Sequence, residues 1–302
     1  MCGPRGKRRN KVGSVERVTW GAPSLWINLF PVYWGRVSGF FKENGIDLKV
    51  KYLHGGPELA EAVRKGSIRI GNMGVPPFLK AFSEGLPAKI IGSTAIQRLD
   101  SYLVSQREIE RIADLRGKRV GVLSVGSCDS YFLRRIMEKD GMSSDVDTKV
   151  VPLKESYGKL SEILSGRVDA TFMVEPHVTL GESQGMLKVL AHVADYFPKY
   201  QWGILFARED LLTENRGMVN RVLDAYRRSA KSIKEGPEET TAYGSRLFRM
   251  KKAVFRKALD RSLPNWEGEG KLDREGLRNA IRIQREMGAI PRDIDVEELV
   301  DR

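Results

Sequence analysis

Two stretches of this sequence follow the same plan, one hundred residues apart. Residues 45–85 read as strand, loop, helix, strand, loop and helix, with Gly66 closing the first helix and Gly85 the second. Residues 141–185 read the same way, with Gly166 and Gly185 at the corresponding positions. Repetition of one supersecondary unit predicts two lobes of similar plan. Because strands and helices alternate, each lobe is expected to be an α/β domain with a largely parallel sheet.

The connections between the lobes can be placed approximately. We expect strands that cross over near residues 105 and 200, which gives a first lobe of 16–105 plus 200–302 and a second lobe of 106–199. The basic, Gly-rich residues 1–15 are expected to form a disordered head. The helical C-terminal third is expected to pack on the first lobe. A ligand is expected where strand ends of the two lobes face one another.

The stretch between the two repeats carries the most suggestive local pattern. Arg119–Leu123 reads as a buried strand, residues 124–127 break it, and a helix begins at Asp129 and stops at Gly141. Such a turn directs unpaired backbone N–H groups and the positive helix end toward one point. It could hold a carboxylate, sulfonate or phosphate. An ordinary βα unit with a serine N-cap explains the pattern equally well.

Composition excludes several classes of protein. A formal net charge of +12 attracts anions in general, but no helix-turn-helix, zinc-finger or aromatic–basic pattern is present, so we expect no nucleic-acid binding. Two cysteines and three widely spaced histidines favour neither a disulfide framework nor a metal site. No apolar run is long enough to span a membrane. The basic N-terminus is not followed by a hydrophobic segment, so it does not read as a secretory signal.

Several runs resemble a known family. GFFKENGIDLKVKYLHGG, DLRGKRVGV and KLSEILSGRVDATFMVEP are similar to the sulfonate, taurine and nitrate solute-binding proteins of ABC transporters. That superfamily also includes binding proteins and synthases for thiamine pyrimidine precursors. The resemblance covers residues 16–235 and implies a two-lobe, type II periplasmic-binding fold that closes by a hinge motion. It also implies a monomer that delivers a small solute to a membrane permease, in the periplasm or at the cell surface. The missing signal leaves the cytoplasm as the alternative.

The resemblance places candidate ligand contacts on both lobes. It implies contacts from Ser24, Leu25, Trp26, His54, Gly55, Asn72, Met73, Gly74 and Val75 on the first lobe, from Ser124, Ser127, Cys128, Glu175 and His177 on the second, and from Trp202 near the hinge. Backbone N–H groups and hydroxyls of residues 124–127 would hold the polar head of the ligand. Sulfonate binders commonly carry a small-residue-plus-Asp pattern at 72–75 and an aromatic residue before Glu175, and this chain departs from both.

The resulting hypothesis is a receptor for a small organic anion or heteroaromatic solute, with no catalytic residue, cofactor or metal. The alternative is a cytoplasmic enzyme on the same fold, a desulfinase, decarboxylase or pyrimidine synthase. Cys128 lies where a helix begins, which can lower the pKa of a thiol. The desulfinase uses a cysteine in the first-lobe loop, however, and residues 21–30 contain none. The cysteine-rich motif of the pyrimidine synthases is also absent, so a buried, inert Cys128 is the favoured interpretation.

Overall fold

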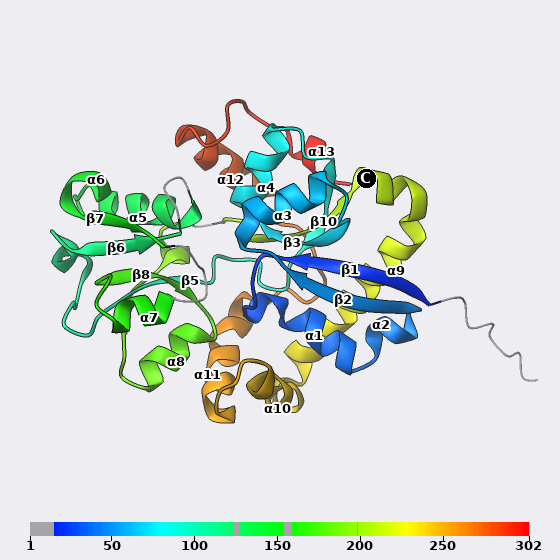
Figure 1. The fold of residues 1–302 in the computed structure, drawn as a ribbon, viewed down its shortest axis with the longest axis horizontal. Coiled ribbons are helices and arrows are strands. Elements are labelled where there is room, and N and C mark those ends of the chain that lie inside the picture. Colours follow the sequence, from blue (N-terminus) through cyan, green and yellow to red (C-terminus); the bar gives the residue numbers. More distant parts are fainter. Residues whose placement is uncertain (1–14, 124–126, 154–158, 198, 302) are drawn as a thin grey trace, which may run out of the picture.

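The computed structural model describes residues 15–123, 127–153, 159–197 and 199–301. In these residues two five-stranded sheets, each covered by helices, form two lobes that lie side by side (Figure 1). The predicted disordered head, residues 1–15, falls almost entirely outside the described residues, as does Ser124. None of the described helices combines the length and the apolar character that crossing a membrane requires.

The helices and strands have the following bounds. The first lobe contains β1 (Glu16–Ala22), α1 (Phe30–Val37), α2 (Phe40–Glu43), β2 (Ile46–Tyr52), α3 (Gly55–Arg64), β3 (Ile70–Gly74), α4 (Val75–Ser83), β4 (Ala88–Ser93) and β10 (Gly203–Arg208). The second contains β5 (Ser101–Ser105), β6 (Arg119–Val122), α5 (Cys128–Lys139), α6 (Ser144–Asp147), β7 (Lys149–Pro152), α7 (Lys159–Leu164), β8 (Ala170–Val174), α8 (His177–Ser183) and β9 (Lys188–His192). The C-terminal part contains α9 (Glu209–Glu235), α10 (Pro237–Leu247), α11 (Lys252–Ser262), α12 (Arg274–Glu286) and α13 (Val296–Leu299). Short 3₁₀ turns are η1 (Ile27–Leu29), η2 (Ile112–Leu115), η3 (Val193–Asp195) and η4 (Leu263–Asn265).

The two sheets repeat one topology. The first has the strand order β2-β1-β3-β10-β4 and the second β7-β6-β8-β5-β9. In each sheet four strands run in one direction, and the strand that arrives from the other lobe, β10 or β5, runs antiparallel to both of its neighbours. Gly66 and Gly85, and their counterparts Gly166 and Gly185, all have positive φ angles of 64° to 84°. Glycine adopts this conformation without a Cβ penalty, so the chain can turn there. The predicted α/β fold with two similar lobes is confirmed.

Two expectations about the lobes are wrong. Residues 101–105 were expected in the first lobe, but β5 pairs with β8 and β9 in the second sheet. The crossover therefore precedes this strand and runs through residues 94–100. The C-terminal helices do not pack on the first lobe alone, because α11 contacts α8 of the second lobe (Figure 1). Sequence periodicity marks which face of a helix is apolar but does not say which neighbour covers that face.

The chain bends within two helical segments. α1 ends at Val37 and α2 begins after Gly39, whose φ is +84°. α9 begins at Glu209 and is kinked at Asn215. Asp273 is the N-cap residue of α12, because its side chain accepts a hydrogen bond from the Gly276 N–H.

Candidate functional site

A small cavity lies between the lobes where the two crossovers meet. It is lined by Trp26, Ile27, Asn28, Ile96, Asp100, Val174, Glu175 and Trp202. These residues come from the loop after β1, both crossovers and the end of β8. The cavity measures about 10 Å³, close to the space that one water molecule needs. A solute can therefore enter only when the lobes or the lining side chains move apart.

Two tryptophans form the aromatic wall of the cavity. The rings of Trp26 and Trp202 meet edge to face, with centroids 5.8 Å apart, an arrangement that aromatic pairs favour. Trp202 also contacts Phe132 of α5, with centroids 5.7 Å apart. The Trp26 Nε1 is buried, and within the described residues it has no hydrogen-bond partner. An indole N–H in this situation is a donor available to a ligand acceptor.

Glu175 provides the first of two buried carboxyl groups. Its side chain is fully buried and accepts hydrogen bonds from the Thr179 N–H (3.1 Å) and hydroxyl (2.9 Å) and from Arg261 Nη1 (3.0 Å). Burial, and next the nearby charge of Asp100, raise the pKa of Glu175 to about 7, although Thr179 and Arg261 act in the opposite direction. Its backbone oxygen accepts from the Ile27 N–H at 3.2 Å. This bond connects the second lobe to the first.

Asp100, at the end of the first crossover, provides the second carboxyl group. It is buried and accepts hydrogen bonds from the Ser262 hydroxyl (2.7 Å) and the Tyr102 hydroxyl (3.0 Å). Burial raises the pKa of Asp100, and these two donors only partly offset the rise. His192 stacks on Tyr102 with centroids 4.6 Å apart, and its Nε2 lies 2.9 Å from the Leu99 carbonyl oxygen. Among the described residues, the cavity wall thus contains two acidic groups and no basic one.

The predicted anion site at the start of α5 contains a carboxylate of the chain itself. Asp129, in the first turn, accepts from the Leu123 N–H at 3.2 Å and forms an ion pair with Lys159 at 2.6 Å. Both side chains are nearly buried, with 13% and 11% exposed. Ser127 is the N-cap residue of this helix and makes no side-chain cap bond. The positive helix end is therefore already compensated from within lobe 2.

Cys128 and His177 lie at the first positions of α5 and α8 and are half-buried. Burial, and next the charge of Asp129, raise the pKa of the Cys128 thiol, so the thiol stays protonated at neutral pH. This state agrees with the favoured interpretation of an inert cysteine. Burial lowers the pKa of His177, so its imidazole is neutral at pH 7.

The other predicted contacts on lobe 1 are spread over different environments. His54 is exposed, whereas Gly55 faces lobe 2, because a Cβ added there would lie 4.0 Å from Leu123. Asn72 is buried and accepts a hydrogen bond from the Trp20 indole at 2.8 Å. Met73, Gly74 and Val75 are buried, and the Val75 N–H donates to the Trp202 carbonyl at 2.9 Å. Ser24 is buried and Leu25 is half-buried beside Trp26. For all of these residues, a role in binding stays a prediction.

The structure therefore brings Trp26, Glu175 and Trp202 together at one cavity and adds residues that the sequence did not reveal. Asn28, Ile96 and Asp100 line the same cavity, and Arg261 lies behind Glu175. Asp100 has a weak sequence signal, because it directly precedes a strand at a crossover. Arg261 has none, since it is one of many basic residues in the C-terminal third.

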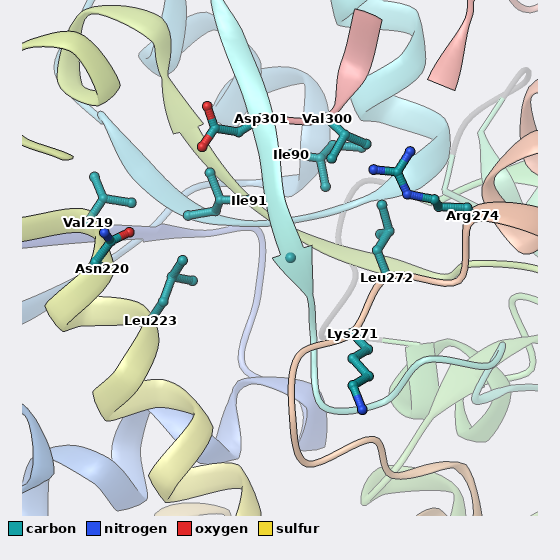
Figure 2. A pocket seen from close by; sticks show the side chains of 11 residues that line it. Ile90, Ile91, Val219, Asn220, Leu223, Lys271, Leu272, Arg274, Val300 and Asp301 are labelled. Atoms are coloured by element: carbon teal, nitrogen blue, oxygen red, sulfur yellow. The ribbon is translucent and has the colours of Figure 1, made fainter. Parts of the chain in front are cut away.

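A larger hollow, of about 390 Å³, lies on the outer edge of lobe 1 beside β4 (Figure 2). Its floor consists of aliphatic side chains of β4, α9 and the C-terminal segment. Its charged side chains already have partners within the chain: Lys271 pairs with Glu269, Arg274 with Glu297, and Asp301 with Arg216. In the part of the chain that the structure describes, its lining comes from lobe 1 and the C-terminal part. We therefore place the candidate solute site between the lobes.

Comparison with known proteins identifies the class and then the family. The two repeated α/β lobes with crossover strands are the periplasmic-binding-protein fold. Residues 26–240 match the NMT1/THI5-like family, which is most of the chain. The protein belongs to this family. Within the described residues, no group of three or more histidine, cysteine, aspartate or glutamate side chains is arranged to hold a metal ion.

Proteins that are similar to this chain carry different names. A putative binding protein of Brucella abortus is 26% identical over 230 residues, which are 73% of this chain and 70% of that protein. The 4-amino-5-hydroxymethyl-2-methylpyrimidine phosphate synthase of Candida albicans is 24% identical over 230 residues, 71% of this chain and 66% of the synthase. The periplasmic aliphatic sulphonate binding protein SsuA from Escherichia coli shares the fold, with a TM-score of 0.73 at 17% identity over 95% of this chain and 91% of that one.

Proposed function

We propose that this protein is the solute-binding receptor of an ABC importer and that it encloses its solute between the two lobes. Family membership, the relative named as a binding protein and the fold shared with a periplasmic sulphonate receptor support this assignment. The receptor works as a monomer in the periplasm or at the cell surface and passes its solute to a membrane permease.

The solute class follows from one observation. Two tryptophans and two buried carboxyl groups line the same interlobe cavity. Tryptophan faces bind flat aromatic or cationic groups, and carboxylates accept hydrogen bonds from N–H donors. This combination suits a heteroaromatic compound that carries an amino group, such as an aminopyrimidine. The Trp26 indole N–H would donate to a ring nitrogen or carbonyl of the same compound.

A sulfonate fits this cavity less well. An anion beside Asp100 and Glu175 would further disfavour the ionised form of two carboxyl groups whose pKa values burial already raises, which costs free energy in a region of low dielectric constant. The helix end of α5, which could otherwise compensate an anion, already faces Asp129. Of the two solute classes that the sequence leaves open, the geometry supports the heteroaromatic one.

We also propose binding without chemical conversion. The relative named as a synthase is an enzyme, and an enzyme of this kind is the alternative assignment. Cys128 is the residue best placed for nucleophilic chemistry, and its thiol pKa is raised by burial. A protonated, half-buried thiol is a poor nucleophile. The buried carboxyl groups have hydrogen-bond partners that fix their orientation, which suits recognition of a solute.

A thermal-unfolding screen of the purified chain tests this proposal. The panel contains aminopyrimidines, formylaminopyrimidine, pyridoxal phosphate, taurine, alkanesulfonates, nitrate and aromatic carboxylates, and any hit is recovered and analysed chemically. A ligand at 100 times its Kd adds about 2.7 kcal/mol of stability. We expect stabilisation by an aminopyrimidine that is recovered unchanged. Stabilisation only by sulfonates would overturn the solute class, and consumption of the hit would overturn the receptor assignment.

Substitution of the two cavity carboxyl groups tests whether they contact the solute. Asp100→Asn and Glu175→Gln each remove a carboxylate from the cavity wall and are expected to weaken binding of an aminopyrimidine by about tenfold or more. Asp260→Asn removes one acidic charge from α11 outside the cavity, where Asp260 pairs with Arg256. It should leave the Kd within about twofold of the wild-type value. Equal effects of all three substitutions would point to long-range charge instead of direct contact.

A further inference from the structure

The two lobes are connected by more than the two crossovers. α11 of the C-terminal part lies against α8 of lobe 2 (Figure 1). Its last two residues, Arg261 and Ser262, both contact lobe 2 or the crossover that leads into it. This helix lies beyond residue 240, where the match to the family ends.

Arg261 contacts three groups of lobe 2 at once. Its Nη1 donates a hydrogen bond to Glu175 at 3.0 Å and lies 2.7 Å from an oxygen of Glu182 on α8. Its guanidinium carbon lies 5.4 Å from the ring centroid of Tyr102 on β5. These three partners belong to different elements of lobe 2. One cation shared by two carboxylates, one of them fully buried, is costly to remove because both acidic groups lose it together.

The rest of α11 is fixed to lobe 1. Phe255, one and a half turns before Arg261, is fully buried and packs edge to face on Phe30 of α1, with centroids 5.2 Å apart. Leu259 is also buried, in the hydrophobic cluster that contains β1, α1 and α9. After η4 the chain returns to lobe 1, where the Trp266 indole donates to the Ala230 carbonyl of α9 at 2.9 Å. The helix is therefore held against lobe 1 by buried side chains.

We propose that Arg261 is a clasp by which the C-terminal helices hold lobe 2 against lobe 1 and thereby set how readily the cleft opens. Any movement that carries α8 away from α11 must separate Arg261 from Glu175 and Glu182. The Ser262–Asp100 hydrogen bond holds the same helix end to the crossover. Since Glu175 also lines the cavity, the clasp acts directly beside the candidate solute site.

Hydrogen exchange of the Ile27 amide, measured without added solute, tests the clasp independently of the proposed function. This N–H donates across the cleft to the Glu175 carbonyl, so its exchange rate reports separation of the lobes. Arg261→Met removes the cation and keeps an unbranched side chain of similar helix propensity. We expect the Ile27 peptide to exchange about tenfold faster, with a larger radius of gyration by small-angle X-ray scattering. The β1 peptide, Glu16–Ala22, should not change.

Arg256→Met is the matched control. Arg256 lies on the same helix with nearly the same side-chain exposure, 28% against 29% for Arg261. Its ion pairs within the described residues are with Glu238 and Asp260 of the C-terminal part. It should leave exchange of the Ile27 peptide within about twofold. Equal effects of the two substitutions, or no effect of Arg261→Met, would overturn the clasp.

Two milder variants keep the test decisive if Arg261→Met does not fold. Arg261→Lys keeps the charge but replaces the longer guanidinium, whose Nη1 contacts both carboxylates, by an ammonium group on a shorter side chain. Glu182→Gln removes one partner and leaves Glu175 paired. Each is expected to speed exchange of the Ile27 peptide by about threefold, between the wild-type and Arg261→Met values. Wild-type exchange in both variants would overturn the proposal.

Discussion

The loops that begin α5 and α8 both follow parallel strands of the second sheet, β6 and β8, but their acidic residues are paired in different ways. At α5, Asp129 is paired with Lys159 within lobe 2. At α8, Glu175 is paired with Arg261, which belongs to the C-terminal part and lies on α11. In the first pair, the charges of Asp129 and Lys159 neutralise each other, so no unpaired charge is left there to attract a ligand. The second pair connects two parts of the molecule and leaves a carboxyl group at the cavity wall.

Under the proposed function, the α5 loop has a structural role and the α8 loop recognises the solute. A carboxylate and an ammonium that are both nearly buried form a closed unit. Glu175, by comparison, shares Arg261 with Glu182 of α8, and Asp100 accepts hydrogen bonds from the hydroxyls of Ser262 and Tyr102. Both carboxyl groups also line the cavity. Four predictions test this contrast.

The largest effect is expected at the α5 pair. Lys159→Met leaves Asp129 nearly buried without its cation, and we expect a loss of about 3–5 kcal/mol in the free energy of unfolding, measured in urea. Adding Asp129→Asn in the same chain should recover much of this loss. Arg167→Met breaks the more exposed pair with Glu162 at 2.8 Å and should cost less than about 1 kcal/mol. Similar losses at both positions would show that the α5 pair is no more important than a surface one.

The second prediction concerns pH and Glu175. Its pKa of about 7 in the folded protein exceeds the ordinary value of 4.5 that it has when unfolded. Between these values the folded state holds a proton that the unfolded state has lost, so its contribution to stability is full below pH 4.5 and is lost as the pH rises through 7. The difference in unfolding free energy between wild type and Glu175→Gln should fall by about 3 kcal/mol from pH 4.5 to pH 8.

The groups that face Glu175 define the control for this measurement. Asp100, Tyr102, Arg261 and Glu182 surround it, and His192 lies beside Asp100. Burial raises the pKa of Asp100 as well, so Asp100→Asn should show a loss in the same direction. A difference between wild type and Glu175→Gln that does not vary with pH would mean that Glu175 keeps an ordinary pKa.

The sequence predicted the fold better than it predicted the site, for a physical reason. Hydrophobic periodicity and the glycines at 66, 85, 166 and 185 are local signals, and they were enough to identify two similar lobes. The cavity depends on contacts across long sequence separations, such as Arg261 with Glu175, 86 residues apart. The aromatic residues and Glu175 were found through the family pattern. Arg261 lies outside that pattern, and no local spacing connects it to α8.

The third prediction concerns the Trp26 indole. Its N–H is buried, and the described residues give it no partner, so Trp26→Phe should change the unfolding free energy by less than about 1 kcal/mol. The same substitution should weaken binding of the solute found in the screen by about tenfold in calorimetry, because one donor is lost. Trp20→Phe is the control. Its indole donates to Asn72 inside lobe 1, so it should reduce stability and leave binding unchanged. The reverse pattern would place the solute away from Trp26.

The smallest effect on solute binding is expected from substitution of Ser127, the N-cap residue of α5. This substitution tests whether the solute binds at the α5 loop or at the α8 loop. If an anionic head bound at the start of α5, Ser127→Asp would place a like charge against it and abolish binding. If Asp100 and Glu175 instead receive the amino group of the solute, the same change should alter the Kd by less than about threefold. Aspartate is a good N-cap residue, so the helix should keep its stability. The Kd values of wild type, Ser127→Asp and Ser127→Ala, measured by calorimetry with one solute, distinguish the two outcomes. Loss of binding only in Ser127→Asp would mean that the polar head of the solute binds at the start of α5. Asp100 and Glu175 would then have a structural role alone.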